Sequence, residues 1–389
     1  MFTLVFKMYA SQKKVAADIV SALQKGKRII TLVAPVQWGK TGVIVKTLDY
    51  ITSTTMLDTP LVSLTNCFVI TGLNDNEWKE QMKERVQPWV KDHVYHMKDL
   101  EKMHNNYLTY TRNICIVIDE CHIACGIDQT ISKFLYRHKL LLEEDMLRKN
   151  VYIIQVSATP SNLLFQSEQY KTIYNKTIVV GKTLSYCGFD TMLKYNKIKH
   201  LNNIRNKREL DIIFQTIRHI SIPKYHIIRC RKSPRHRNDP IEDKMIDMCS
   251  RYKLKYIFHN HKNSIQNPNQ LLEITPSEHT IIFIKNRWKA SKTIPYHNIG
   301  VCVDSAKDYN ALVQGLPGRL CGHNRIIEHM PLLFCNLKPI EEYIKLISTK
   351  YNYIDIEWKS MNLTTMKNKI TNIKNSYINI ENSYITIEH

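Results

Sequence analysis

Apolar runs of strand length alternate with helix-like segments along most of the chain, and each strong run ends at polar residues. The clearest runs are Arg28–Val33 before a loop, Ile114–Ile118 before Asp119, and Val151–Val156 before Ser157. This alternation is typical of parallel α/β sheets, in which crossover helices connect strands that point the same way. Because ligands bind at the carboxyl ends of such strands, the polar residues there are the first candidates for a site.

A second series of strands and helices starts near residue 206 and predicts a second sheet. Its expected strands are Tyr225–Arg229, Lys255–Phe258, Thr280–Ile284 and Ile299–Val303. At 389 residues the chain is long enough for two ordinary domains. We therefore expect an α/β protein with lobes at 1–190 and 191–335, a linker at about 185–205, and a short C-terminal extension, 336–389, of unknown role.

Residues 34–41 carry the most specific motif of the first series. Gly39, Lys40 and Thr41 follow a buried strand and open a helix, which is the setting of a phosphate-binding loop. In such a loop the backbone amides and the helix N-terminus hold the phosphates of a nucleotide. Lys40 is expected to neutralise the phosphates, and the Thr41 hydroxyl to join the shell of Mg²⁺. The motif predicts ATP and Mg²⁺ as cofactors.

The loop departs from the common pattern at three positions. Ala34 replaces the first Gly, and Gln37 and Trp38 replace the usual small residues. For Trp38, stacking on a ligand and packing in the core both stay open. A chance Gly-Lys-Thr at a helix start is also compatible with the loop alone, so the assignment depends on a partner motif elsewhere.

Asp119 and Glu120 supply that partner at the end of the strand Ile114–Ile118. A carboxylate in this position holds Mg²⁺ through water, and its neighbour polarises the attacking water. Asp119 is therefore the expected metal ligand and Glu120 the expected base. A surface Asp-Glu pair is the alternative, and the phosphate loop upstream disfavours it.

The charge balance bears on the kind of partner. The chain has 55 Lys and Arg against 35 Asp and Glu, a formal net charge of +20. Each phosphate that Lys or Arg neutralises releases a condensed counterion, so a basic chain favours a polyanion. DNA or RNA bound through its backbone is the expected partner, although solubility alone also accounts for a basic surface.

Cysteine spacing and hydropathy exclude several classes. The ten Cys form no CxxC pair, so we expect free thiols and no structural zinc. No run approaches the roughly 20 apolar residues of a membrane span, and the apolar N-terminal stretch is too short for a signal peptide. We expect an intracellular protein, cytoplasmic, nuclear or in a viral factory, that is not secreted and has no membrane partner.

The residues of two further motifs resemble those of one enzyme family. Asp119–His122 reads Asp-Glu-Cys-His, and Ser157–Pro160 reads Ser-Ala-Thr-Pro. With the phosphate loop, these segments resemble superfamily 2 DExH-box helicases and ATPases, closest to helicase-like proteins of large DNA viruses and phages. The resemblance covers about residues 9–325. It implies two RecA-like lobes, with Ser157 and Thr159 coupling hydrolysis to lobe movement.

Two further positions of the first lobe take roles from the resemblance. Gln12 begins the first helix where relatives place an adenine-reading glutamine, and Thr71 precedes a segment that looks like motif Ia, whose Thr contacts nucleic-acid phosphates. Simpler interpretations stay open: Gln12 as an ordinary helix residue, Thr71 as a helix cap, and Trp78 in that segment as a core residue.

The segment Gln314–His323 resembles motif VI, written QxxGRxxR. Arg319 matches the arginine that reaches the γ-phosphate, where charge develops during hydrolysis. Gln314 is implied to lie at the cleft between the lobes. Both residues are expected to be catalytic.

Motif VI is altered here in two ways. One extra residue separates Gln314 from Gly318, and Gly322 occupies the place of the second arginine. Whether His323 or Arg325 replaces that arginine is open.

Two basic segments of the second lobe are candidates for nucleic-acid contacts. Lys285, Arg287 and Lys289 follow a buried strand and resemble a motif V loop, which binds backbone phosphates. A second basic cluster follows the strand Tyr225–Arg229 and consists of Arg229, Arg231, Lys232, Arg235 and Arg237. The alternative for the first segment is a solvated charged face, and the alternative for the second cluster is a disordered basic loop.

The resemblance implies a helicase or translocase that hydrolyses ATP between two lobes to move along DNA or RNA. One alternative is a transcription-associated or remodelling ATPase that displaces a polymerase without unwinding, with transcription or replication proteins as partners. Another is a nucleic-acid-binding scaffold whose ATPase has decayed.

Overall fold

The computed structural model describes residues 8–53, 58–72, 76–108, 111–123, 129–141, 143–159, 174–230, 240–260, 262–285, 294–352 and 356–358. Within these ranges the chain forms two compact units. The first contains the described residues up to Pro35 and those of Gly39–Lys182. The second contains Val36–Trp38 and the described residues of Thr183–Thr364.

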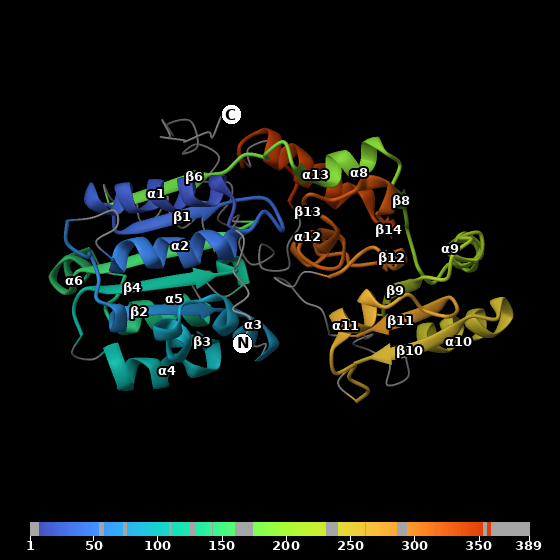
Figure 1. The fold of residues 1–389 in the computed structure, drawn as a ribbon, viewed down its shortest axis with the longest axis horizontal. Coiled ribbons are helices and arrows are strands. Elements are labelled where there is room, and N and C mark those ends of the chain that lie inside the picture. The colour runs from blue at the N-terminus through green and yellow to red at the C-terminus, as the bar shows by residue number, and fades with distance from the viewer. Residues whose placement is uncertain are drawn as a thin grey trace. The chain divides into compact units, whose positions relative to one another are not determined.

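The first unit is a six-stranded sheet with helices on its faces (Figure 1). Its strands are β1 (Ile29–Val33), β2 (Cys67–Thr71), β3 (Val94–His96), β4 (Ile114–Asp119), β5 (Val151–Ser157) and β6 (Asn175–Val179). Its helices are α1 (Ala10–Gln24), α2 (Lys40–Thr52), α3 (Asn76–Arg85), α4 (Leu100–Met103), α5 (Thr130–Arg137) and α6 (Glu143–Lys149). Short helical turns are η1 (Leu64–Asn66), η2 (Pro88–His93), η3 (Met97–Asp99), η4 (His104–Leu108) and η5 (Cys121–Ile123).

The strand order of the first sheet brings the motif-bearing loops together. The order is β3-β2-β4-β5-β1-β6, and every pairing is parallel. β5 lies between β4 and β1, with Asp119 in register with Val156 and Ser157 with Val33. The ends of these three strands are therefore neighbours at one edge. Since both faces of the sheet are covered, its central strands are mostly apolar, with Thr31 and Gln155 as polar residues inside β1 and β5.

The second unit repeats the architecture with a different strand order. Its strands are β7 (Tyr186–Cys187), β8 (Ile198–His200), β9 (Tyr225–Arg229), β10 (Lys255–His259), β11 (Thr280–Ile284), β12 (Ile299–Asp304), β13 (Gly322–His323) and β14 (Leu332–Cys335). Its helices are α8 (Phe189–Lys194), α9 (Lys207–Arg218), α10 (Pro240–Tyr252), α11 (Pro268–Glu273), α12 (Tyr309–Val313) and α13 (Leu337–Ser348), with the turns η6 (Pro317–Leu320) and η7 (Ile327–His329).

Six of these strands form a parallel sheet in the order β10-β11-β9-β12-β14-β8, and β7 pairs with β13 in an antiparallel ribbon. The expected α/β class with two parallel-sheet lobes is confirmed. The segment expected to be a linker, 185–205, instead contains β7, α8 and the edge strand β8. Strand β8 was not predicted from this polar sequence, because an edge strand needs few apolar residues.

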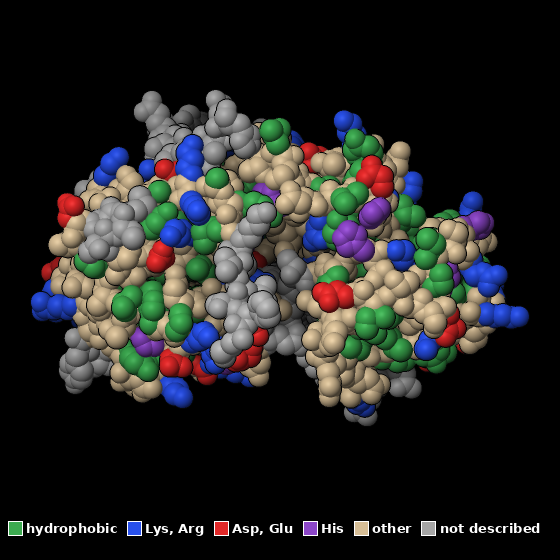
Figure 2. All heavy atoms as spheres, viewed as in Figure 1, with side chains coloured by type: hydrophobic (Ala, Val, Ile, Leu, Met, Phe, Trp, Pro, Cys, Tyr) green, Lys and Arg blue, Asp and Glu red, His purple; other side chains and the backbone are tan. Residues whose placement is uncertain are grey.

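The C-terminal extension is described only in part. Helix α13 belongs to the second unit, and most residues beyond it lie outside the described ranges. Among the described helices, none has the length and apolarity to cross a membrane. On the face drawn in Figure 2, Lys and Arg side chains are scattered over both units among acidic ones.

Candidate active site

The loop after β1 is fixed at its start by a hydrogen bond and at its end by a glycine turn. The amide of Ala34 donates to the carbonyl oxygen of Ser157 at 3.2 Å, which fixes the start of the loop against β5. Gly39 has φ +101° and stands at the N-cap of α2. Only glycine adopts this left-handed conformation without strain, so the Gly of the motif is required by the turn.

Lys40 is a buried cation at the first position of α2. Its side chain is 8 % exposed, and its Nζ donates to the carbonyl oxygen of Pro35 at 3.3 Å. Across the described ranges no carboxylate forms an ion pair with it. Burying a charge without a counter-charge is costly. This burial is compatible with an anion beside Lys40, and its phosphate-binding role stays a prediction.

Gln12 packs against the loop from α1. Its Nε2 donates to the carbonyl oxygen of Gly39 at 2.9 Å, and its Oε1 accepts from the amide of Tyr9 at 2.9 Å. A Cβ at Gly42 would lie 2.7 to 2.9 Å from the end of the Gln12 side chain, so only glycine leaves room for it there. Gln12 thus supports the loop, and its adenine-reading role stays a prediction.

Asp119 is the last residue of β4 and is held by two hydrogen bonds. Its Oδ2 accepts from Nε1 of Trp78 at 3.1 Å, and its Oδ1 from the amide of Glu120 at 3.0 Å. Burial raises the pKa of Asp119, the Glu120 charge raises it further, and the Trp78 hydrogen bond and the Lys40 charge oppose both effects. Two adjacent buried carboxylates create a demand for positive charge in this part of the first unit.

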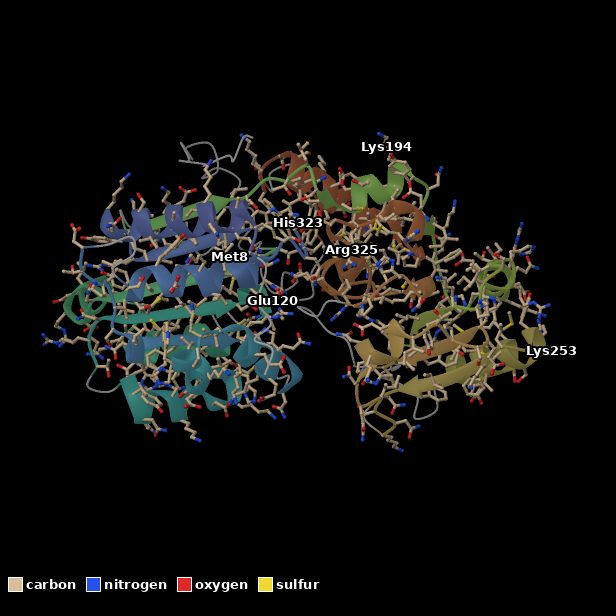
Figure 3. The ribbon with its side chains drawn as sticks, in the orientation of Figure 1. Met8, Glu120, Lys194, Lys253, His323 and Arg325 are labelled. Carbon is tan, nitrogen blue, oxygen red and sulfur yellow. The ribbon has the colours of Figure 1, made fainter. Side chains whose placement is uncertain are left out.

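Glu120 turns out of the strand directly after Asp119. It is buried and has φ +50°, a left-handed conformation that is uncommon for a residue with a side chain. Figure 3 labels Glu120 at the end of β4. Such backbone strain is frequent at functional positions, where the surrounding structure imposes it.

The residues expected to couple hydrolysis to movement lie beside this pair. Ser157 Oγ accepts from the amide of Thr159 at 3.0 Å and lies 3.2 Å from Nδ1 of His122. The same nitrogen lies 3.4 Å from Oε2 of Glu120. Polar contacts therefore connect Ser157, at the end of β5, through His122 to Glu120, the expected base directly after β4, and the coupling role itself stays a prediction.

The donor set of the first unit fits ATP with Mg²⁺. The N-terminus of α2, with the amides of Gly39 and Lys40, and the Lys40 ammonium suit phosphate oxygens. The Thr41 hydroxyl and the Asp119 carboxylate are oxygen ligands of the kind that Mg²⁺ prefers. The uncompensated Lys40 ammonium and the two buried carboxylates both match a ligand that carries anionic phosphates together with a divalent cation.

In the second unit, the altered motif VI forms the turn η6. Arg319 lies in this turn and Gln314 caps α12, and both side chains are buried. A Cβ at Gly318 would run into the carbonyl oxygen of Val313, so this glycine is needed for the turn to pack on α12.

Arg325 and His323, both labelled in Figure 3, form hydrogen bonds inside the second unit. Arg325 Nη2 donates to the carbonyl oxygen of Arg319 at 3.1 Å, and its guanidinium lies 4.4 Å from the ring centroid of Tyr296. His323 Nε2 donates to the carbonyl oxygen of Trp38 at 2.9 Å. Trp38 is fully buried, which favours packing over stacking on a ligand.

The expected nucleic-acid residues are described unevenly. Thr71 is buried at the end of β2, in register with Asp119. Lys285 follows β11 and is partly exposed, whereas Arg287 and Lys289 lie outside the described residues. Their contacts with nucleic acid stay predictions.

Arg229, the first residue of the second basic cluster, has an acidic partner. Its Nη1 lies 3.0 Å from Oδ2 of the fully buried Asp304. The guanidinium therefore compensates a buried carboxylate at the end of β12, a structural role that the sequence did not reveal. The other four members of that cluster lie outside the described residues.

Comparisons with known proteins give distant similarity. No protein-family model matches the chain. It is 26 % identical over 379 residues to an uncharacterized protein of Acanthamoeba polyphaga mimivirus, with 91 % of each protein covered. Among solved structures, it is similar to a variant of S. cerevisiae Dbp5 bound to RNA and ADP BeF3, with a TM-score of 0.48, 14 % identity, and 93 % of each chain covered.

Proposed function

We propose that this protein is an ATP-dependent nucleic-acid helicase or translocase of superfamily 2. The observation that supports it most is that Lys40, Asp119 and Glu120 all lie at the carboxyl ends of the parallel strands of the first sheet. The charge of Lys40 acts on the Asp119 carboxyl across these strand ends. A buried cation without a carboxylate partner and a buried carboxylate pair fit ATP·Mg²⁺ better than they fit a structural role.

The residues of the first unit have distinct tasks in this proposal. Lys40 and the loop amides bind the phosphates, and Thr41 and Asp119 hold Mg²⁺, which supplies positive charge to the phosphate oxygens. Glu120 takes a proton from the attacking water. Arg319 of the second unit is proposed to stabilise charge on the γ-phosphate, with Gln314 beside it.

Nucleic acid is proposed to bind through its backbone. A net charge of +20 suits a polyanion, and backbone contacts carry little sequence preference. Thr71, Lys285, Arg287 and Lys289 are the proposed contacts, and Ser157 and Thr159 the proposed link between hydrolysis and movement.

The first experiment measures the ATP turnover rate with single- and double-stranded DNA and RNA over a salt series. We expect stimulation by at least one nucleic acid, weakening as salt rises because counterion release drives the binding. A rate that no nucleic acid changes would remove nucleic acid from the function while leaving the ATPase intact.

A second experiment separates helicase from translocase. Strand displacement reports unwinding of a duplex, and triplex displacement reports movement along an intact duplex. Activity in the first assay supports a helicase, and activity in the second alone supports a translocase. Failure in both, with nucleic-acid-stimulated hydrolysis retained, would contradict movement along nucleic acid.

A further inference from the structure

The hydrogen bond between Trp78 and Asp119 joins helix α3 to the proposed metal carboxylate. Trp78 lies near the start of α3, the helix that follows β2, and β2 is the direct neighbour of β4 in the sheet. The indole ring is 3 % exposed and its Nε1 lies 3.1 Å from Asp119 Oδ2. The indole of Trp78 on α3 is thus hydrogen-bonded to the carboxylate of Asp119 at the end of β4.

The two hydrogen bonds to Asp119 divide its oxygens between two donors. Oδ2 faces the indole and Oδ1 faces the amide of Glu120. A carboxylate has about four lone-pair sites, so each oxygen keeps acceptor capacity for a metal or its water. Two donors from fixed groups hold the plane of the carboxylate, because an indole has few rotatable bonds and its N–H is never lost to titration near neutral pH.

The same face of α3 carries a positive charge toward this site. Arg85 lies seven residues after Trp78 and therefore on the same side of the helix. Burial lowers the pKa of Arg85, and the charges of Asp119 and Glu84 oppose that effect. Helix α3 thus presents both a hydrogen-bond donor and a guanidinium in the electrostatic range of Asp119.

We propose that Trp78 is a positioning residue for the magnesium carboxylate, holding Asp119 in the orientation that receives the metal. This inference rests on the proposed function, since it assigns Trp78 a task at the same site. Groups that hold metal ligands from behind commonly contribute 10- to 100-fold to metal affinity. Trp78 acts through Asp119 and is not itself a metal ligand.

A purely structural role for Trp78 makes a different prediction, and two substitutions separate them. Trp78→Phe keeps a large apolar ring but deletes the donor. Trp78→His loses more apolar volume but keeps a donor, because Nε2 of an imidazole occupies the same ring position as Nε1 of an indole. Met82→Ala serves as the packing control, since Met82 is buried one turn along the same helix.

The experiment measures the affinity of each full-length protein for ADP by calorimetry, once with Mg²⁺ and once with EDTA, so that no hydrolysis is needed. The gain in affinity that Mg²⁺ provides is the readout. In Trp78→Phe we expect the ratio of the ADP affinity with Mg²⁺ to the ADP affinity in EDTA to be about tenfold smaller than in wild type. Its ADP affinity in EDTA should be unchanged. Trp78→His and Met82→Ala are expected to keep most of the gain, whatever their melting temperatures.

The outcomes distinguish the positioning role of Trp78 from the proposed ATP·Mg²⁺ site on which it rests. If the wild-type protein binds ADP with no gain from Mg²⁺, the proposed site itself fails. When the wild-type gain is present, an unchanged gain in Trp78→Phe overturns the role of Trp78 alone. A loss that follows apolar volume, larger in Trp78→His than in Trp78→Phe, also overturns it and leaves Trp78 as a core residue.

Discussion

The side-chain amide of Gln12 donates to the carbonyl oxygen of Gly39 at 2.9 Å, so the first turn of α1 supports the phosphate loop directly. Gly42 makes this contact possible, since any side chain there would meet the end of Gln12. The loop is therefore held from α1 as well as from β1 and α2.

Gly42→Ala tests this support. The new methyl group displaces the Gln12 amide, and the lost hydrogen bond is expected to raise the KM for ATP roughly three- to tenfold. The free energy of unfolding is expected to rise, because Ala is favoured over Gly in a helix interior by about 1 kcal/mol. Steady-state kinetics and a thermal melt measure both effects.

Gly181→Ala is the matched control, because a Cβ at Gly181 meets nothing within 4 Å. It is expected to leave the KM unchanged. If Gly42→Ala also leaves the KM unchanged while Gln12→Ala raises it, the displacement of Gln12 by the methyl group is wrong.

Lys40→Met is expected to abolish hydrolysis without destabilising the ligand-free protein. Lys40 forms no ion pair in the described residues, so its removal relieves a desolvation penalty, which offsets the loss of its charge effect on Asp119, and the melting temperature should change little. The increase in melting temperature that wild type shows with ATP·Mg²⁺ should disappear. A marked loss of stability in ligand-free Lys40→Met would show that the ammonium has a structural counter-charge.

The fully buried His226 predicts a pH dependence of stability in the second unit. Burial, with a smaller effect of His279, lowers the pKa of His226 to about 3. Between that value and the unfolded pKa of about 6.5, only the unfolded state takes up the proton, so stability is lost as pH falls through this range.

From about pH 7.5 to about pH 5.5, the loss from this one group is roughly 1 kcal/mol. Urea denaturation of the full chain at the two pH values measures it. His226→Leu is expected to show a smaller pH response from a lower starting stability. An equal response in wild type and His226→Leu would assign the acid sensitivity to other groups.

The ion pair of Arg229 with Asp304 predicts a stability effect rather than a binding effect. Arg229→Met leaves the Asp304 carboxylate buried without its cation, which costs about 3–5 kcal/mol in comparable buried pairs. Arg229→Met combined with Asp304→Leu should recover much of this loss. Nucleic-acid affinity of the folded protein, followed over a salt series, should keep the wild-type slope. A shallower slope would mean that Arg229 contacts phosphate.

Most interior strands of both sheets and the edge strand β10 could be predicted from the sequence, whereas the interior strand β14 and the edge strands β3, β6 and β8 could not. Thr280–Ile284 is the strand β11 as predicted, because a strand buried on both faces reads as one apolar run. The edge strands β3 and β6 are short or mixed in polarity, since an edge is covered on fewer sides. Their sequences therefore resemble loops.

For the candidate site, the motifs identified Lys40 and Asp119 as candidates because each lies at or just after the end of an apolar strand. The support from Trp78 was not predicted, since a Trp in a helix reads as core and its bond depends on β2 lying beside β4. The only signal was its place in the helix that follows the neighbouring strand. The ion pair of Arg229 was not predicted for a related reason, because its buried partner Asp304 lies 75 residues further along the chain.

The most direct test of the central claim is ATP turnover by Glu120→Gln in the presence of the nucleic acid that stimulates wild type most. The substitution keeps the size and the neighbours of Glu120 and removes its ability to take the proton from water. We predict that ATP·Mg²⁺ still binds and that turnover falls at least about a hundredfold. Wild-type turnover by Glu120→Gln would contradict the assignment of the base and of the site around it.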